Sequence, residues 1–426
     1  MKRLVPPAVP FDRPQMTRLA VAHALCDVYQ GAVPALLPFL LAAHGWSYGT
    51  GSLLVLAATL SSSIVQPVFG HLSDKRPAPW LMPAGFVVAA VGLSVVGFVD
   101  SPTAAFVAVL VSGLGVAAFH PEGSRAAAYA AGERKATGMS YFSVGGNAGW
   151  ALGPLLVLVT VLPFGLHATL LLALPGLAGA VLTARDLPRL RVARARATAH
   201  ATATATALAA KADRTGRTST PPQDDWRAFG ILTGAVAARS IVYFVLMTFV
   251  PLYFVDVLHT SEAAGETALI AYLVAGAIGT LVGGRLADRF GRRPLLLASF
   301  TLQAPLLILF LLGGPVLATV ALGLVGLIAI ATFSISVVMG QAYLPNHLGV
   351  ASGVTLGLAI GVGGLAAAAM GPLADAAGPK APLELIVLLP LVGLACVRAL
   401  PREDDRVAPE QRPRSLRPAG ALRATG

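Results

Sequence analysis

The sequence has few charged residues and few cysteines. Only 12% of its 426 residues are charged, whereas soluble domains carry about 25%, so a soluble globular protein is excluded. Its two cysteines, Cys26 and Cys396, lie in apolar runs near opposite ends of the chain without CxxC or Cys/His spacing, which argues against a disulfide framework and a zinc site. The sequence contains no P-loop or HExxH motif, which argues against an ATP-driven pump or an enzyme. We therefore expect no metal, no cofactor and no enzymatic activity.

Most of the sequence consists of long apolar runs. Hydrophobic residues make up 56% of the chain, and many runs reach the roughly 20 residues that a membrane-spanning helix needs. The first run is longer than the 7–15 residues of a typical signal-peptide core, so we expect it to be an uncleaved span. The pattern predicts an all-α, polytopic membrane protein with 12 transmembrane helices, near 18–42, 50–73, 79–99, 103–130, 136–161, 164–184, 228–257, 267–287, 294–312, 315–344, 348–372 and 382–400.

One long hydrophilic segment divides these spans into six and six. It starts with several arginines, continues through a low-complexity Ala/Thr stretch and ends at two prolines, a composition typical of a solvated linker. A short amphipathic helix could form at its start. We expect an N-terminal six-helix bundle over 1–184, a linker over 185–227, a C-terminal six-helix bundle over 228–400 and a disordered tail over 401–426.

The basic residues predict how the chain is oriented. The 31 Lys and Arg outnumber the 20 Asp and Glu, for a formal charge of +11. Of the 31, 28 lie on the side of the termini and the linker, two lie inside spans, and only Lys380 lies on the opposite side. Because loops rich in Lys and Arg stay in the cytoplasm, we expect a multi-pass protein of the inner (plasma) membrane with both termini cytoplasmic. The basic charge then reflects topology and does not indicate nucleic-acid binding. The expected partners are the lipid bilayer and a small-molecule substrate, with the protein as a monomer.

A short motif occurs at equivalent loops of the two halves. GHLSDKRP spans 70–77 after the second span, and GRLADRFGRRP spans 284–294 after the eighth. Parallel six-helix repeats are the plan of transporters whose halves rock about a central substrate site. A carboxylate held by a helix N-terminus and a guanidinium is a contact that moving halves can make or break. The predicted conformational-gate residues are Gly70, Asp74, Arg76, Gly284, Asp288, Arg289 and Arg292.

This paired motif resembles the loop motif of the major facilitator superfamily. Within the superfamily, HALCDVYQG at 23–31, SIVQP at 63–67, FHPEGSR at 119–125 and SVGGNAGWALGP at 143–154 resemble the fosmidomycin-resistance efflux proteins. The resemblance implies alternating access and antiport, in which a small drug or organic anion, such as a phosphonate antibiotic, leaves the cell in exchange for protons. Two departures are Pro77, where the motif has Gly, and Val109, where drug antiporters have Arg.

Ionisable residues inside spans are costly, so we treat them as functional candidates. His23, Asp27 and Gln30 share one face of the first helix, and Glu122 lies three residues before Arg125, within pairing distance. The predicted proton-coupling residues are Asp27, Glu122, His23 and His120. Two structural roles remain open. Asp27 could instead be a hydrogen-bonding residue at a kink, and the charges together could form an ion-pair network.

The intramembrane arginines are candidates for binding an anionic substrate, because guanidinium groups bind phosphonates and carboxylates bidentately. The predicted substrate-binding residues are Arg125, Arg239, Tyr29, Gln30, Tyr243, Asn147 and Gln341. Glycines at four-residue spacing in the fifth span predict close helix packing and resemble the antiporter motif of the superfamily. They are Gly145, Gly149 and Gly153, followed by Pro154.

The residues alone do not decide whether substrate and proton move in opposite directions or in the same direction. Protonation of Glu122 would release Arg125 and leave the cavity more positive. A proton and an anion would then bind together, as in a symporter. Proton-coupled uptake of a small organic anion is therefore the alternative to export.

Overall fold

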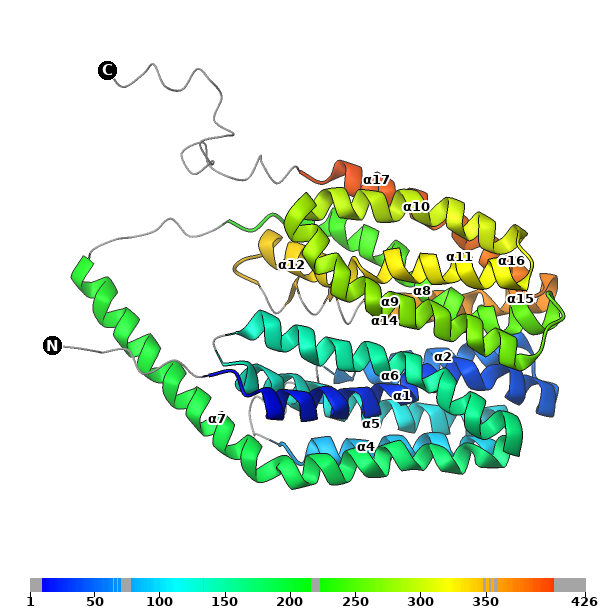
Figure 1. Cartoon of the computed structure of the whole chain (residues 1–426), viewed down its shortest axis with the longest axis horizontal. Helices are drawn as coiled ribbons and strands as arrows, with labels where there is room; N and C mark the ends of the chain where they lie inside the picture. Colours follow the sequence, from blue (N-terminus) through cyan, green and yellow to red (C-terminus); the bar gives the residue numbers. More distant parts are fainter. Residues whose placement is uncertain are drawn as a thin grey trace, which may run out of the picture.

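The computed structural model describes residues 10–63, 65–66, 68–69, 78–132, 134–215, 223–347, 350–351, 354–355 and 359–401. The regular elements within these ranges are all helices (Figure 1). The first half contains α1 (Arg13–His44), α2 (Tyr48–Ser63), α4 (Leu81–Ser94), η1 (Val96–Phe98), α5 (Pro102–Ala131), α6 (Lys135–Phe164), η2 (Leu166–Leu172) and α7 (Ala173–Thr215). The second contains α8 (Trp226–Asp256), α9 (Glu262–Phe290), α10 (Arg292–Leu312), α11 (Pro315–Ile330), α12 (Phe333–Tyr343), α14 (Ala359–Ala369), α15 (Gly371–Ala377), α16 (Lys380–Leu385), η4 (Ile386–Leu388) and α17 (Leu389–Ala399).

Eleven described segments are long and apolar enough to cross a membrane. They are Arg13–His44, Leu81–Phe98, Pro102–Ala131, Thr137–Phe164, Leu166–Arg196, Trp226–Asp256, Glu262–Ala287, Arg292–Leu312, Pro315–Tyr343, Ile360–Ala377 and Lys380–Ala399. The 16-residue helix α2 lies where the remaining predicted span, 50–73, begins, and part of that span lies outside the described residues. The predicted all-α, multi-spanning class is confirmed.

Several helices begin at capping residues that the sequence contains. Ser101 and Ser261 accept hydrogen bonds from backbone N–H groups in the first turns of α5 and α9, and Asp225 does the same for α8. Such caps satisfy amide groups that have no partner within the helix. The starts of three spans are therefore fixed locally.

The two halves lie side by side, with α1–α7 below α8–α17 in the view of Figure 1. Helices α1 and α2 meet α8, α14 and α15, and α6 meets α9. Both α1 and α8 have 83% of their apolar window buried, more than any other span. The structure therefore places α1 and α8 at the centre of the molecule. We call the end where α1 begins and α17 ends the inner end, and the opposite end the outer end.

The helix α7 extends well beyond the predicted end of the sixth span. A linker is expected from residue 185, but α7 continues through the arginines and the Ala/Thr stretch to Thr215 (Figure 1). Alanine is the strongest helix former, and no glycine interrupts the chain between Gly179 and Gly216. Residues 185–215 are therefore helical over a longer stretch than expected, and their role as the linker between the halves stays a prediction.

Candidate functional site

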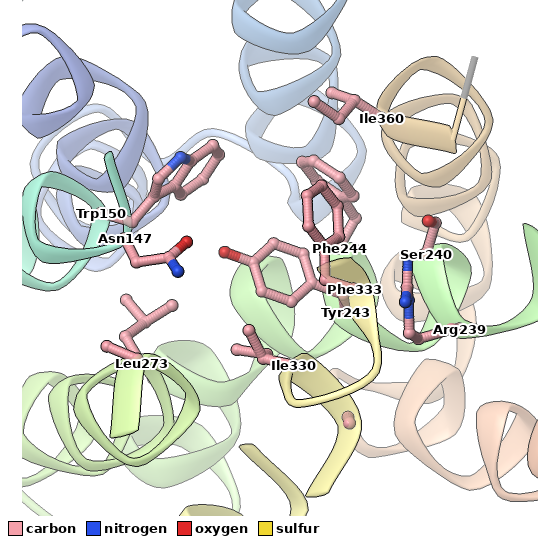
Figure 2. A pocket seen from close by; sticks show the side chains of 12 residues that line it. Asn147, Trp150, Arg239, Ser240, Tyr243, Phe244, Leu273, Ile330, Phe333 and Ile360 are labelled. Carbon is pink, nitrogen blue, oxygen red and sulfur yellow. The ribbon is translucent and has the colours of Figure 1, made fainter. Parts of the chain in front are cut away.

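A cavity lies between the halves, midway along the bundle. Its volume is about 110 Å³, which is below the roughly 300–1,000 Å³ of typical small-molecule sites. Helices α6, α8, α9, α11, α12 and α14 line it (Figure 2). The lining residues are Asn147, Trp150, Arg239, Ser240, Tyr243, Phe244, Leu273, Ala277, Ala329, Ile330, Phe333 and Ile360.

Arg239 is the charged residue of this lining, and its guanidinium is only partly satisfied. The residue is 6% exposed. Its Nη1 donates to Thr332 Oγ1 and to Ser336 Oγ, each at 3.3 Å, while Nη2 has no hydrogen-bond partner. The Phe333 ring lies below the guanidinium carbon at 5.1 Å. Among the side chains that the structure describes, no carboxylate pairs with Arg239, so the cavity contains a buried positive charge without a counter-ion.

Aromatic side chains form the rest of the polar wall. The ring of Tyr243 contacts those of Trp150 and Tyr272, with centroids 6.0 and 5.8 Å away. The buried hydroxyl of Tyr272 has no hydrogen-bond partner. Figure 2 shows the Asn147 amide and the Tyr243 hydroxyl pointing toward each other in the cavity, and Asn147 also donates to Thr280 Oγ1 at 3.3 Å. Polar groups from both halves thus face one space.

The other predicted arginine has a different environment. Arg125 Nη1 lies 3.0 Å from Glu122 Oε1, and this carboxylate also accepts from the backbone N–H of Ala78 at 3.2 Å. Arg125 is therefore paired, whereas Arg239 is not. The sequence treats the two arginines alike, and the structure brings only Arg239 into the cavity lining.

A second polar cluster lies within the first half, where α1 meets α5. Oδ2 of Asp27 lies 3.2 Å from His23 Nε2, and Oδ1 lies 3.3 Å from His120 Nε2. His23 and Asp27 are 8% and 5% exposed. Three of the four predicted proton-coupling residues therefore form one group, and Glu122 pairs separately with Arg125.

The remaining predicted substrate residues lie outside the main cavity. Tyr29 is buried within the first half, where its hydroxyl donates to the Leu172 carbonyl at 2.9 Å. Gln30 lines a smaller neighbouring cavity with Trp150. Gln341 lies on α12 and is not among the lining residues.

The glycines of α6 pack directly against α1. A Cβ atom at Gly145, Gly149 or Gly153 would lie 2.1 to 2.5 Å from backbone atoms of α1. Pro154 follows them inside α6. Side chains at these positions would force the two helices apart, so the glycines set the distance between α1 and α6.

Only part of the predicted gate is described. Gly70, Asp74 and Arg76 lie outside the described residues, as does the side chain of Asp288. Gly284 is exposed near the inner end of α9, and the Arg289 guanidinium lies 5.2 Å from the Phe290 ring. Arg292 begins α10 after Gly291, whose φ of 91° favours glycine. The gate stays a prediction.

Two relevant residues were missed from the sequence. Tyr272 faces Tyr243 beside the cavity, and Glu266 is 0% exposed on α9 with neither carboxyl oxygen hydrogen-bonded. Neither residue is among the site residues predicted from the sequence. A charged residue one turn inside an apolar span is the signal that could have identified Glu266.

Comparisons with known proteins agree with this architecture. The chain matches the family model described as Major Facilitator Superfamily over residues 19–368 and 232–424. It is 33% identical over 381 residues to the uncharacterized MFS-type transporter YfnC of Bacillus subtilis (strain 168), covering 89% of this chain and 91% of that protein. It is 29% identical over 379 residues to the fosmidomycin resistance protein of Escherichia coli (strain K12), with the same coverage.

Solved structures with the same fold are more distant in sequence. The nucleoside transporter NupG has a TM-score of 0.69 at 15% identity, covering 91% of this chain and 98% of NupG. A bacterial homologue of the human lysosomal transporter Spinster, in an inward-facing and occupied conformation, has a TM-score of 0.67 at 14% identity, covering 92% and 96%. The chain belongs to the Major Facilitator Superfamily and is a multi-pass secondary transporter, not an enzyme.

Proposed function

We propose that this protein exports a small organic anion, such as a phosphonate antibiotic, by alternating access and in exchange for protons. The observation that carries the proposal is the unpaired guanidinium of Arg239 in the cavity between the halves. Burying a cation without a counter-ion is costly. A bound phosphonate or carboxylate would supply the missing negative charge and accept hydrogen bonds from Nη2.

The cavity lining suits a small anion with a short apolar body. The unpartnered hydroxyl of Tyr272 lies on a ring that packs against Tyr243, and Tyr243 and Asn147 add polar groups from opposite halves. Trp150, Phe244 and Ile330 supply apolar surface. A substrate held by Arg239 would contact both halves, so its binding can favour closure of one half on the other.

Export is proposed on the relationship to the fosmidomycin resistance protein. The case for symport assumed that protonation of Glu122 makes the substrate cavity more positive. In the structure Glu122 pairs with Arg125, which does not line the cavity, and not with Arg239. Its protonation would leave the charge in the cavity lining unchanged.

Glu266 is the carboxyl group that we propose for proton coupling. Both of its oxygens are buried without partners. An ionised carboxylate there would be strongly disfavoured, so the group is held neutral in this conformation. Opening of the outer end would let water reach it and release its proton. The proton-coupling roles of Asp27, His23, His120 and Glu122 stay predictions.

The test is transport by the full chain in proteoliposomes with an imposed pH gradient and fosmidomycin as the probe. We expect fosmidomycin to cross the membrane in the direction opposite to the flow of protons. Arg239→Gln should weaken its binding about 10- to 100-fold, the range for one charged hydrogen-bonded contact. Arg191→Gln removes an exposed arginine of α7 and is the control. Movement with the proton would indicate the symporter, and unchanged binding by Arg239→Gln would reject the anion site.

A further inference from the structure

The two histidines of the cluster at α1 and α5 are each anchored through the same ring nitrogen. Nδ1 of His23 lies 2.7 Å from the Phe142 carbonyl oxygen, and Nδ1 of His120 lies 2.9 Å from the Val116 carbonyl oxygen. A carbonyl oxygen can only accept, so each Nδ1 carries a hydrogen and donates. In a neutral imidazole the other nitrogen, Nε2, then presents a lone pair.

These lone pairs converge with the carboxylate of Asp27. The two Nε2 atoms are 3.3 Å apart, and the carboxylate oxygens lie 3.2 and 3.3 Å from them. Acceptor atoms at these distances repel one another unless a cation lies between them. The arrangement is buried, with side-chain exposures of 10% for His23, 7% for Asp27 and 21% for His120.

We propose that His23, Asp27 and His120 bind one divalent transition-metal ion of the zinc class. Zinc bonds nitrogen and oxygen at about 2.0–2.2 Å in tetrahedral geometry, which separates neighbouring ligand atoms by about 3.3 Å. The separation of the two Nε2 atoms matches that value, and each Nε2 lies at this distance from a different oxygen of Asp27, so the carboxylate can bind through one oxygen or chelate through both. Histidine ligands of metals usually donate their other N–H to a carbonyl or carboxylate, and both histidines here already do. The fourth position is left for water or an external ligand.

The surroundings hold these side chains in place. The ring of Phe142 stacks on that of His23 with centroids 4.0 Å apart. On the α6 side, a Cβ at Gly146 would lie 2.6 Å from His23 Cε1 and 2.9 Å from Asp27 Oδ2. The absent side chain of Gly146 therefore lets α6 cover the cluster without displacing its ligands.

The site was missed in the sequence because its ligands come from two helices, with His23 and His120 97 residues apart. All three ligands belong to the first half, so the metal would tie α1 to α5 in both inward- and outward-open states. We therefore expect the ion to stabilise the first half. This role does not depend on which substrate the central cavity carries.

The test uses the full chain, purified in detergent without a histidine tag and stripped with chelator, then titrated with Co²⁺. We expect one equivalent to bind with the visible absorption of tetrahedral cobalt, Zn²⁺ to displace it, and the melting temperature to rise. Asp27→Asn and His120→Gln should each weaken binding at least about tenfold, as loss of one of three ligands predicts. His167→Gln, which alters a histidine beside Phe98 outside the cluster, should bind as the wild type does.

Two results would overturn the proposal. One is wild-type protein that takes up no stoichiometric Co²⁺ or Zn²⁺, which would leave a shared proton as the cation between the acceptors. The other is unchanged affinity in both ligand variants. If one variant fails to fold, the second variant and the wild-type stoichiometry still decide the matter.

Discussion

The hydroxyl of Tyr48 on α2 donates a hydrogen bond to Oδ2 of Asp256 on α8, 2.9 Å away. This bond joins the two halves at the outer end. The backbone N–H of Gly49 adds a second link by donating to both oxygens of Asp375, at 3.1 and 3.2 Å. The outer end is therefore held closed by carboxylates of the second half that bind the first turn of α2.

Breaking this closure should expose the outer end. In a background of Cys26→Ser and Cys396→Ser, a cysteine introduced at Val255, which lines a pocket at this junction, would report access to a membrane-impermeant maleimide. We expect Tyr48→Phe combined with Asp375→Asn to raise the labelling rate several-fold. Labelling of a cysteine at His259, which is exposed in the connection between α8 and α9, should not change. Equal rates at Val255 with and without the two substitutions would contradict the closure.

Replacing Arg239 should make the protein more stable while it loses function. Neutralising a buried charge without a counter-ion removes a desolvation cost, so Arg239→Gln should leave stability unchanged or raise it by about 1–3 kcal/mol. Arg125→Gln breaks an ion pair at 3.0 Å and should lower stability instead. Thermal unfolding in detergent without substrate measures both. A large loss of stability in Arg239→Gln would mean that the guanidinium has a counter-ion within the protein.

The contact between α1 and α6 should not tolerate a side chain at Gly149. A Cβ there would lie 2.4 Å from the Ala24 carbonyl oxygen and 2.8 Å from Asp27 Cβ. Because a backbone oxygen cannot rotate away, Gly149→Ala should cost about 1–3 kcal/mol. At Gly230, with nothing within 4 Å of a built Cβ, the same change should be neutral or slightly stabilising. If the two variants melt alike, the close packing is not as described.

A carboxylate at the inner end should make stability depend on pH. Asp224 accepts from the Asn346 N–H at 3.1 Å and lies 2.8 Å from His347 Nδ1. Partial burial alone would raise the pKa of Asp224, but these hydrogen bonds hold it below its usual value. A lowered pKa contributes stability above the unfolded pKa of about 3.9, and that contribution disappears as the pH falls through the folded value.

The corresponding measurement compares wild type with Asp224→Asn at several pH values. The wild type should melt at a higher temperature at pH 5–7, and the difference should close below about pH 4. His259→Gln, at an exposed position on the outer side, is the control for a general effect of pH. If the melting-temperature difference between wild type and Asp224→Asn does not change with pH, the negative charge of Asp224 does not contribute to stability.

The sequence predicted features that depend on spacing within one helix. His23 and Asp27 are four residues apart and do meet, and the four-residue spacing of Gly145, Gly149 and Gly153 does face another helix. The long α7 was missed because an Ala/Thr-rich run reads as low complexity although alanine favours helix.

Relationships between helices could not be predicted in the same way. Nothing in the spacing reveals that Arg239 lacks a counter-ion or that His120 meets Asp27 from α5. Such facts depend on how each helix is rotated against its neighbours, which packing of the whole bundle decides. For the same reason Arg125 and Arg239 could not be separated until their partners were known.

Glu266 should respond to protons without being needed for the fold. The helices packed on α9 contain the charged residues Lys135 of α6, Arg227, Arg239 and Asp256 of α8, and Arg292 and Arg293 of α10, and no hydrogen bond joins any of them to Glu266. Within their bounds, α11 and α12 contain no Asp, Glu, Lys or Arg. No described group pairs with the Glu266 carboxyl, so burial alone keeps it neutral.

Glutamine has nearly the same shape as a neutral glutamic acid, so Glu266→Gln should fold and melt like the wild type while fixing the uncharged state. In weakly buffered detergent with a pH dye, fosmidomycin binding should change the proton occupancy of wild type but not of Glu266→Gln. Glu262→Gln, one turn away and partly exposed, should behave as the wild type. If Glu266→Gln keeps both the proton signal and pH-driven transport, the proton is carried elsewhere. If Glu266→Gln instead unfolds, the fold requires an ionised carboxylate at this position, which would contradict a neutral, buried Glu266.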